Sequence, residues 1–153
     1  MKFNLILLLL IAFNNIKADS INEYSAKYFY KSDEISIKGI RKLEIRDGKY
    51  SLNFKAKNLL ASMRVGSEFN INEGVLKTNS YSIRVKPSFV NRDQDIKFDY
   101  IANIIESTGR EKWEEDLDTS GEILDPLNAQ IKIRINLISG LEKFSINLLE
   151  IES

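Results

Sequence analysis

The residues that could do chemistry in this chain are mainly carboxylates and aromatics, because histidine and cysteine are both absent. Without histidine there is no serine–histidine triad, no histidine general base and no common zinc or iron ligand. Acidic side chains gather at Glu114, Glu115, Asp116 and Asp118, and again at Asp93 and Asp95. Paired carboxylates can hydrolyse glycosides or bind calcium, but neither cluster has the spacing of a calcium loop. We therefore expect no metal site and no cofactor, and we interpret both clusters as solvated turns and strand ends.

Aromatic residues are the more suggestive group, because alternation places most of them on one face of a sheet. If a helix covers only part of that face, the remainder would form an apolar groove for an acyl chain or another amphiphile. The alternative is that the same side chains are core packing beneath the helix. The candidate ligand-binding residues are Tyr28, Tyr30, Tyr50, Phe54, Phe69, Tyr81 and Phe98.

Three residues are predicted to have structural roles. Asp99 stands between two aromatic residues in an alternating run, so its side chain should face away from the core or pair with an arginine such as Arg84. Asp125 and Pro126 suit the N-cap and the first position of a helix. A hydrolase that used Asp99 with Asp125 is an alternative, but no recognisable paired motif favours it.

Alternation of apolar and polar residues runs through most of the chain after residue 20 and predicts strands. The runs cover residues 24–31, 43–45, 50–56, 67–72, 81–87 and 96–100, with shorter ones at 104–108, 111–117 and 142–151. Asp47-Gly48 is a strong two-residue hairpin signal, and residues 72–74 form another turn. Helices do not interrupt these runs, so the strands should form an antiparallel meander.

Residues 126–138 fit either a strand or a helix. The isoleucines alternate as in a strand, yet Leu127, Ile131, Ile135 and Ile138 also lie at helical spacing. Local energies do not decide: four isoleucines cost a helix roughly 1.6 kcal/mol relative to alanine, and an aspartate N-cap returns about 1 kcal/mol. Asp125-Pro126 before the run and Gly140 after it form the asymmetric pattern of helix ends. We therefore predict a mainly β (α+β) fold: a curved antiparallel meander sheet with one helix, about 126–138, on its apolar face.

The N-terminus has the layout of a secretory signal peptide. Lys2 precedes an apolar run from Leu5 to Phe13, which is short for a membrane span, and a small residue follows at Ala18. We expect cleavage near Ala18, which would leave residues 19–153 as a single exported domain in the periplasm or outside the cell, with no transmembrane segment. The mature chain then has 20 basic and 22 acidic side chains. This balance gives no electrostatic reason to expect nucleic acid as a partner.

Short motifs in the right order give the chain a family resemblance. An aromatic strand opens the domain, Ser67-Glu68-Phe69 follows a Leu-Leu-Ala segment, and Phe98-Asp99-Tyr100 precedes the helix start Leu124-Asp125-Pro126-Leu127. Over roughly residues 24–151 the sequence resembles the exported bacterial proteins called domain of unknown function 3108. The resemblance implies an antiparallel β protein with one helix on the sheet, and it implies no activity. Family members usually continue for several strands, so residues 142–151 are expected to form an exposed edge that could pair two copies.

The sequence therefore favours a non-enzymatic exported module that binds an apolar or amphiphilic ligand in the cell envelope. The first alternative is a structural protein that joins an envelope partner, or a second copy of itself, through an open strand edge. The second alternative is the carboxylate-based hydrolase described above.

Overall fold

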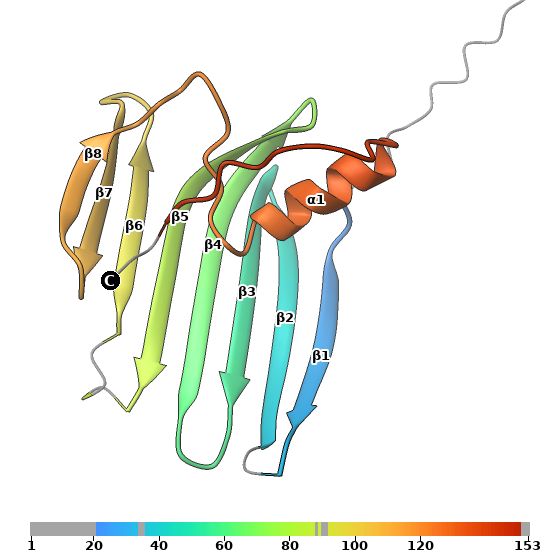
Figure 1. The fold of residues 1–153 in the computed structure, drawn as a ribbon. Helices are drawn as coiled ribbons and strands as arrows, with labels where there is room; N and C mark the ends of the chain where they lie inside the picture. Colours follow the sequence, from blue (N-terminus) through green and yellow to red (C-terminus); the bar gives the residue numbers. More distant parts are fainter. Residues whose placement is uncertain (1–20, 34–35, 88, 90–91, 151–153) are drawn as a thin grey trace, which may run out of the picture.

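A computed structural model describes residues 21–33, 36–87, 89 and 92–150 (Figure 1). Within this part of the chain, eight strands form one antiparallel sheet in which every strand pairs with the next in sequence. The strands are β1 (Tyr24–Lys31), β2 (Ser36–Arg46), β3 (Lys49–Lys57), β4 (Ser62–Asn72), β5 (Val75–Lys86), β6 (Gln94–Asp99), β7 (Ile104–Gly109) and β8 (Trp113–Asp116), and the helix is α1 (Ala129–Ile138). The predicted antiparallel meander with one helix is confirmed. The predicted signal peptide, residues 1–18, lies outside the described residues.

Two tight turns fix the register of the central strands. Asp47 and Gly48 have φ values of 51° and 76°, and Glu73 and Gly74 have φ values of 51° and 79°. Positive φ at both central residues is the conformation of the hairpin turns whose twist matches that of the flanking strands. The β2–β3 and β4–β5 connections are therefore two-residue hairpins, at the positions where the sequence predicts turns.

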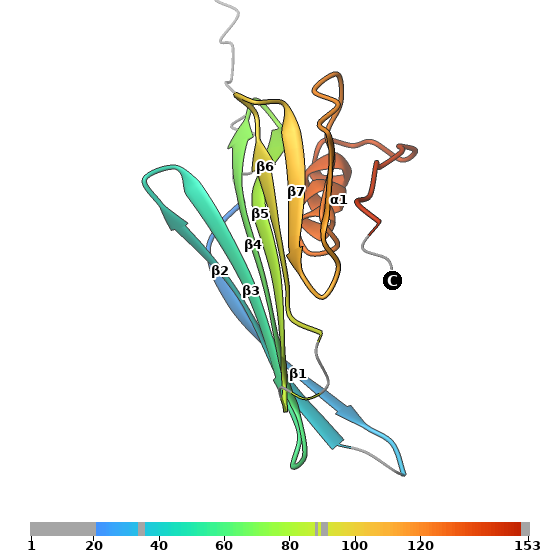
Figure 2. The ribbon, with the colours of Figure 1, turned by 90° about the vertical axis from the view of Figure 1, so that its left-hand side faces the viewer.

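The alternation of side chains divides the sheet into two faces. A row of directly opposed residues crosses all eight strands on one face: Tyr24, Leu43, Leu52, Ser67, Tyr81, Ile96, Ser107 and Trp113. We call this the inner face, because it carries the buried core and because α1 lies on it (Figure 2). The opposite, outer face carries most of the charged side chains of β2, β3 and β4.

Helix α1 covers only part of the inner face. It lies near the upper end of the sheet in Figure 1, the end with the β2–β3 and β4–β5 hairpins. Lys132 of α1 donates a 2.9 Å hydrogen bond to the carbonyl of Gly74 in the β4–β5 turn. The lower end, with the β1–β2, β3–β4 and β5–β6 loops, extends beyond the helix (Figure 1). No helix among the described residues is long and apolar enough to cross a bilayer.

The helix begins three residues later than the sequence predicts. Pro126, Leu127 and Asn128 form a turn, and the helix starts at Ala129. Asp125 caps that turn, since its carboxylate accepts hydrogen bonds from the backbone N–H groups of Leu127 and Asn128 at 2.8 and 2.9 Å. Ile131 is buried, but Ile133, Leu137 and Ile138 are exposed, so the apolar stripe of the helix is wider than the surface it covers.

The predicted C-terminal strand is wrong. Residues 142–150 form no strand, and the segment makes one isolated parallel bridge between Leu148 and Leu124. Its backbone hydrogen bonds join Leu124 to Asn147 and Leu149 at 3.0 and 2.8 Å. Alternation suits a strand, but a strand also needs a free neighbouring edge. The turn after α1 brings the segment back beside Leu124 instead, so the sheet edges are β1 and β8.

Candidate ligand-binding site

The predicted ligand-binding aromatics lie at very different depths. Tyr50 and Phe54 are half-buried against the core. Tyr28 and Tyr30 are open to solvent, with exposed fractions of 45% and 59%. The remaining three, Phe69, Tyr81 and Phe98, are buried in the core. A ligand on the surface would therefore reach Tyr28, Tyr30 and Phe54, whereas the buried three contribute packing.

An apolar surface continues down the inner face beyond α1. The contacts of the helix region with the sheet reach Ser67, Gly74 and Thr78 towards the upper end and extend down to Arg41 at the middle of β2. Below them the side chains on this face are apolar and partly or largely exposed. We call this surface the aromatic shelf and define it by Tyr28, Tyr30, Ile37, Phe54, Ala56, Met63 and Val85.

The strand register builds the aromatic shelf from five neighbouring strands. Tyr28, Gly39, Ala56, Met63 and Val85 stand directly opposite one another in β1 to β5. Gly39 leaves room for the neighbouring ring of β3, because a Cβ there would lie 3.0 Å from the ring of Phe54. That ring meets Tyr28 edge to face at 6.2 Å between centroids. A shallow pocket of about 160 Å³ lies at the lower end of the shelf, beside Ile37, Ala56, Met63 and Val85.

Arg41 lies at the boundary between the shelf and the part of the inner face covered by α1. Its guanidinium carbon is 5.3 Å from the ring centroid of Tyr28 and 5.8 Å from that of Phe54. One Nη donates to the side-chain carbonyl of Gln130 on α1. The Nε atom is buried and has no hydrogen-bond partner among the described residues. In the described part of the chain no carboxylate pairs with this arginine.

Arg41 is not among the site residues predicted from the sequence. A signal was present, because Arg41 has the same parity as Leu43 and Ile45 along β2 and therefore had to share the apolar face. A basic residue at such a position is unusual, since arginine is almost never buried without a partner. Its cationic head lies on an apolar surface, where an anionic group could pair with it.

A buried polar cluster joins the start of the helix region to β4 and β5. The Ser67 hydroxyl donates to the Asp125 carboxylate at 2.6 Å, and the Asn128 amide donates to the Thr78 hydroxyl at 2.9 Å. The Thr78 hydroxyl in turn donates to the Ile123 carbonyl at 2.8 Å. Burial raises the pKa of Asp125 to about 6, although its hydrogen bonds with Ser67, Asn128 and Leu127 act in the opposite direction. The side chains of this cluster are shielded from solvent, so we assign it to helix docking.

The acidic residues singled out in the sequence lie apart from one another. Asp99 is exposed at the end of β6, where its carboxylate accepts from the N–H groups of Ile101 and Ala102 at 2.8 and 2.9 Å. These backbone hydrogen bonds lower its pKa. It faces away from the core as predicted, but Arg84 pairs with Asp95 instead, at 2.7 Å. Asp99 is on the surface and Asp125 is in the core, so no described contact joins this pair.

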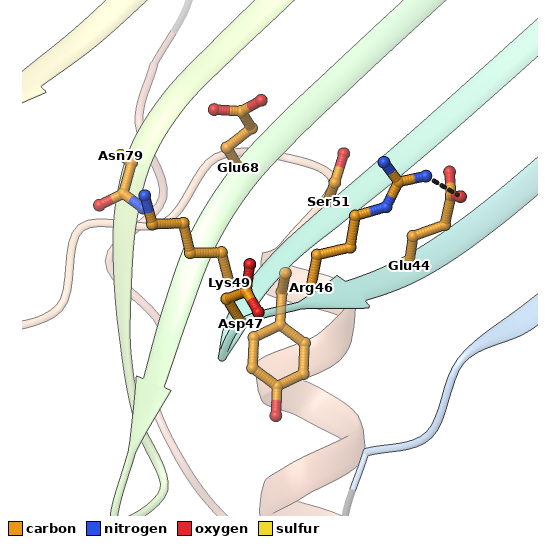
Figure 3. Close-up of a pocket in the computed structure, with 8 residues that line it drawn as sticks. Glu44, Arg46, Asp47, Lys49, Ser51, Glu68 and Asn79 are labelled. Carbon is orange, nitrogen blue, oxygen red and sulfur yellow. Dashed lines mark hydrogen bonds and ion pairs between the residues drawn. The ribbon is translucent and has the colours of Figure 1, made fainter.

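A second pocket, of about 430 Å³, lies on the outer face beside the β2–β3 hairpin (Figure 3). Its lining is mostly charged: Arg46 points at Glu44, with 3.4 Å between nitrogen and oxygen, and Lys49 extends towards Asn79. Lys42 also contacts Glu44, and its hydrogen bond is the main cause of the lowered pKa of that carboxyl group. Because the opposite charges here satisfy one another, this pocket makes a weaker case for a ligand than the shelf does.

A third pocket, of about 640 Å³, separates β8 from the C-terminal segment. Trp113, Ile123 and Leu149 supply apolar lining, and acidic residues such as Glu115 and Asp118 stand at its rim. A ligand that stacks on Trp113 would occupy this pocket. Within the described residues no group of three or more acidic side chains is arranged to hold a metal ion.

Comparisons with protein-family models, with curated proteins and with solved structures found no match to this chain. The resemblance to the domain of unknown function 3108 family therefore stays an expectation drawn from the sequence. The fold is an open antiparallel meander sheet, and one helix covers part of one face. Arg41 lies among aromatic side chains at the edge of the covered part.

Proposed function

We propose that the protein binds an anionic amphiphile on the aromatic shelf and catalyses no reaction on it. The ligand class is an acyl chain that ends in a carboxylate or a phosphate. Arg41 is the observation that carries the proposal: a cation with a buried, unpaired Nε among aromatic rings and, among the described residues, no carboxylate partner.

Arg41 is suited to the head of such a ligand. Arg41 is a partly buried cation whose Nε is shielded from water, and its described hydrogen-bond acceptor is the neutral amide of Gln130. A carboxylate or phosphate would add charge-assisted hydrogen bonds, which are about twice as strong as neutral ones. The planar guanidinium can donate two parallel hydrogen bonds to such a group.

The shelf is suited to the tail. Its central row crosses five strands, which at about 4.8 Å per strand spacing gives an apolar track roughly 19 Å long. Met63 is a flexible side chain that adapts to irregular apolar ligands. Exposed Tyr28 and Met63, at 45% and 38%, offer apolar area that a bound chain would remove from water.

We expect a fluorescent fatty acid to bind the wild-type chain at micromolar concentration in a fluorescence titration. Arg41→Gln should weaken that binding about tenfold or more, because the charged hydrogen bonds are worth roughly 1.5–3 kcal/mol. Arg46→Gln is the matched control, since Arg46 is on the same strand but on the outer face, and it should bind as the wild type does. A fatty alcohol has no charged head, so its affinity should be similar for the wild type and for Arg41→Gln. Equal losses in both arginine variants would contradict the proposal.

A second pair of variants tests the tail independently of Arg41. Met63→Glu places a negative charge on the shelf, whereas Ser62→Glu places the same charge on the neighbouring residue of the outer face. We expect the first variant alone to lose affinity for the fatty acid. A wild-type affinity in Met63→Glu would rule out the shelf as the binding surface.

The second candidate function is an interaction module that uses the open edge of β1. This eight-residue strand pairs with β2 on one side, and within the described residues no strand pairs with its other side. An unprotected edge of this length is a template for pairing with another chain. The edge strand predicted at 142–151 does not form over its described residues, 142–150, so β1 takes its place.

If the edge of β1 pairs two copies, light scattering after size exclusion should give a dimer mass that grows with protein concentration. Phe29→Lys adds a charge to the exposed edge strand and should shift the equilibrium towards monomer. Phe89→Lys is the control, because Phe89 is an exposed aromatic outside the strand, at 87% against 63% for Phe29. A monomer at every concentration, with no partner recovered by crosslinking, would remove this candidate. The hydrolase alternative gains no support from the separate positions of Asp99 and Asp125.

A further inference from the structure

Exposed apolar side chains gather at the lower end of the sheet. Leu59 and Leu60 in the β3–β4 loop have exposed fractions of 98% and 83%, and Phe89 in the β5–β6 loop has 87%. Phe29, on the outer face of β1 and 63% exposed, adds a further ring near the same end. Figure 1 places the β3–β4 loop, and the adjoining ends of β5 and β6, at the end of the sheet away from α1. Large apolar side chains that gather at exposed loops usually mark a surface that meets another apolar phase.

The β3–β4 loop has a defined shape that projects its leucines. The side-chain carbonyl of Asn58 accepts from the N–H groups of Leu60 and Ala61 at 2.9 and 2.7 Å, and the Asn58 N–H donates to the Ala61 carbonyl at 2.9 Å. These hydrogen bonds define an Asx-type turn. Leu59 and Leu60 therefore stand at the tip of a hydrogen-bonded loop.

Basic side chains cover the outer face at the same end. Two adjacent rows of the sheet carry them, one through Lys38 and Lys57 and the next through Lys27, Lys55 and Arg64. None of these five forms an ion pair with another described residue. The chain as a whole has equal numbers of basic and acidic residues, so charge is separated along the sheet rather than in excess.

Few acidic groups offset this charge in the described part of the lower end. Asp33 lies in the β1–β2 loop. Asp95 is paired with Arg84 at 2.7 Å, and the Asp93 carboxylate accepts from the Val85 N–H at 2.9 Å. Towards the upper end, by contrast, Glu44 sits between Lys42 and Arg46 and pairs with both.

We propose that the lower end of the sheet docks on an anionic lipid bilayer. Leu59, Leu60 and Phe89 enter the headgroup region, and the outer face tilts so that Lys55 and Lys57 approach the lipid phosphates. Exposed apolar side chains beside basic side chains bind proteins to the interface of anionic membranes. Each lysine at an anionic surface strengthens binding by about fivefold. Nucleic acid would use the cations but would leave the leucine tips in water. This docking does not depend on the shelf ligand.

The absence of cysteine allows a label to be placed at one chosen position in the full chain. Leu60→Cys and, separately, Ile101→Cys are labelled with an environment-sensitive fluorophore. Ile101 is a matched site, since it is 97% exposed in the β6–β7 turn at the upper end. We expect vesicles with 30% phosphatidylglycerol to shift the Leu60 label to the blue and to expose it to quenchers within the bilayer. The Ile101 label should stay in water, and pure phosphatidylcholine vesicles should shift neither label.

Charge variants test the basic rows separately. Lys55→Glu with Lys57→Glu should weaken vesicle binding at least tenfold in a sedimentation assay, and 0.5 M salt should have a similar effect on the wild type. Lys49→Glu with Lys97→Glu, the same charge change on the outer face towards the upper end, should have little effect. Leu59→Ser with Leu60→Ser should weaken binding to vesicles.

Three outcomes would overturn the proposal. The first is an equal shift of both labels, which would mean that the lower end is not the inserted part. The second is equal binding to neutral and anionic vesicles. The third is salt-sensitive binding to DNA or heparin that needs the lysines but tolerates loss of both leucines, combined with unaltered vesicle binding in that leucine variant.

Discussion

Replacing Phe69 with alanine should lower the free energy of unfolding by about 3–5 kcal/mol, as for other fully buried aromatics. The side chain is 0% exposed and stacks on Tyr50 with 5.4 Å between ring centroids. It lies on β4 in the middle of the sheet, so the surrounding strands cannot close readily over the space it leaves. For a domain of this size a loss of that magnitude is a large part of the total stability.

Chemical denaturation followed by tryptophan fluorescence and circular dichroism would measure the Phe69→Ala effect. Phe89→Ala is the matched control, because it removes the same atoms from a side chain that is 87% exposed. We expect this control to stay within about 0.5 kcal/mol of the wild type. Similar losses in both variants would mean that the core is not centred on β4.

Replacing Asp125 with alanine should cost about 2–4 kcal/mol. The change leaves the Ser67 hydroxyl and the N–H groups of Leu127 and Asn128 buried without their acceptor. It also disconnects the turn before α1 from β4. Asp118→Ala is the control: Asp118 accepts from the Ser120 N–H at 2.8 Å but is exposed, so water can replace it and the loss of stability should be much smaller than for Asp125→Ala.

Asp125 should also give the protein a distinctive pH dependence. Its pKa is about 6 in the folded chain against an ordinary 3.8, so the folded state holds more protons than the unfolded state between these values. Stability from this group is therefore fully present below pH 4 and is lost as the pH rises to 6, by about 3 kcal/mol in total. Asp99 and Asp118 act in the opposite direction below about pH 4, because their pKa values are lowered.

Asp125→Asn isolates that contribution. The amide oxygen can still accept from the turn N–H groups, and the amide nitrogen can donate to Ser67, but nothing titrates. We expect the difference in unfolding free energy between the wild type and this variant to change across pH 4–6 and to be flat on either side. A constant difference over pH 3–8 would mean that folding does not shift the pKa of Asp125.

The strands and their order could be predicted because local features determine them. Alternation indicates each strand, and Asp47-Gly48 and Glu73-Gly74 indicate where the chain reverses. The prediction of a C-terminal strand was wrong for a related reason: alternation suits a strand but does not show which neighbouring strand the segment would pair with. Asp125-Pro126 correctly indicated a helix but not its first residue, because the aspartate caps a turn that precedes the helix.

The candidate site was harder to predict because it depends on which part of the inner face stays open. The alternation of residues predicted that Tyr28 and Phe69 share one face of the sheet. How deeply each side chain is buried depends on where α1 lies, and alternation along the strands does not predict that position. Arg41 could have been found by its parity, yet its importance comes from the absence of a described carboxylate near it. That absence is a property of the folded chain.

The meander order has a consequence for how the chain assembles. Each strand bonds to a neighbour in sequence, whereas the helix region reaches back 58 residues from Asp125 to Ser67 and 89 residues from Gln130 to Arg41. Local pairings close quickly and distant ones slowly. The sheet can therefore form hairpin by hairpin as the polypeptide emerges, while its apolar inner face is still exposed. The helix packs on that face last. In that interval the nascent sheet would be most vulnerable to aggregation, and a chaperone that shields apolar surface would help it most.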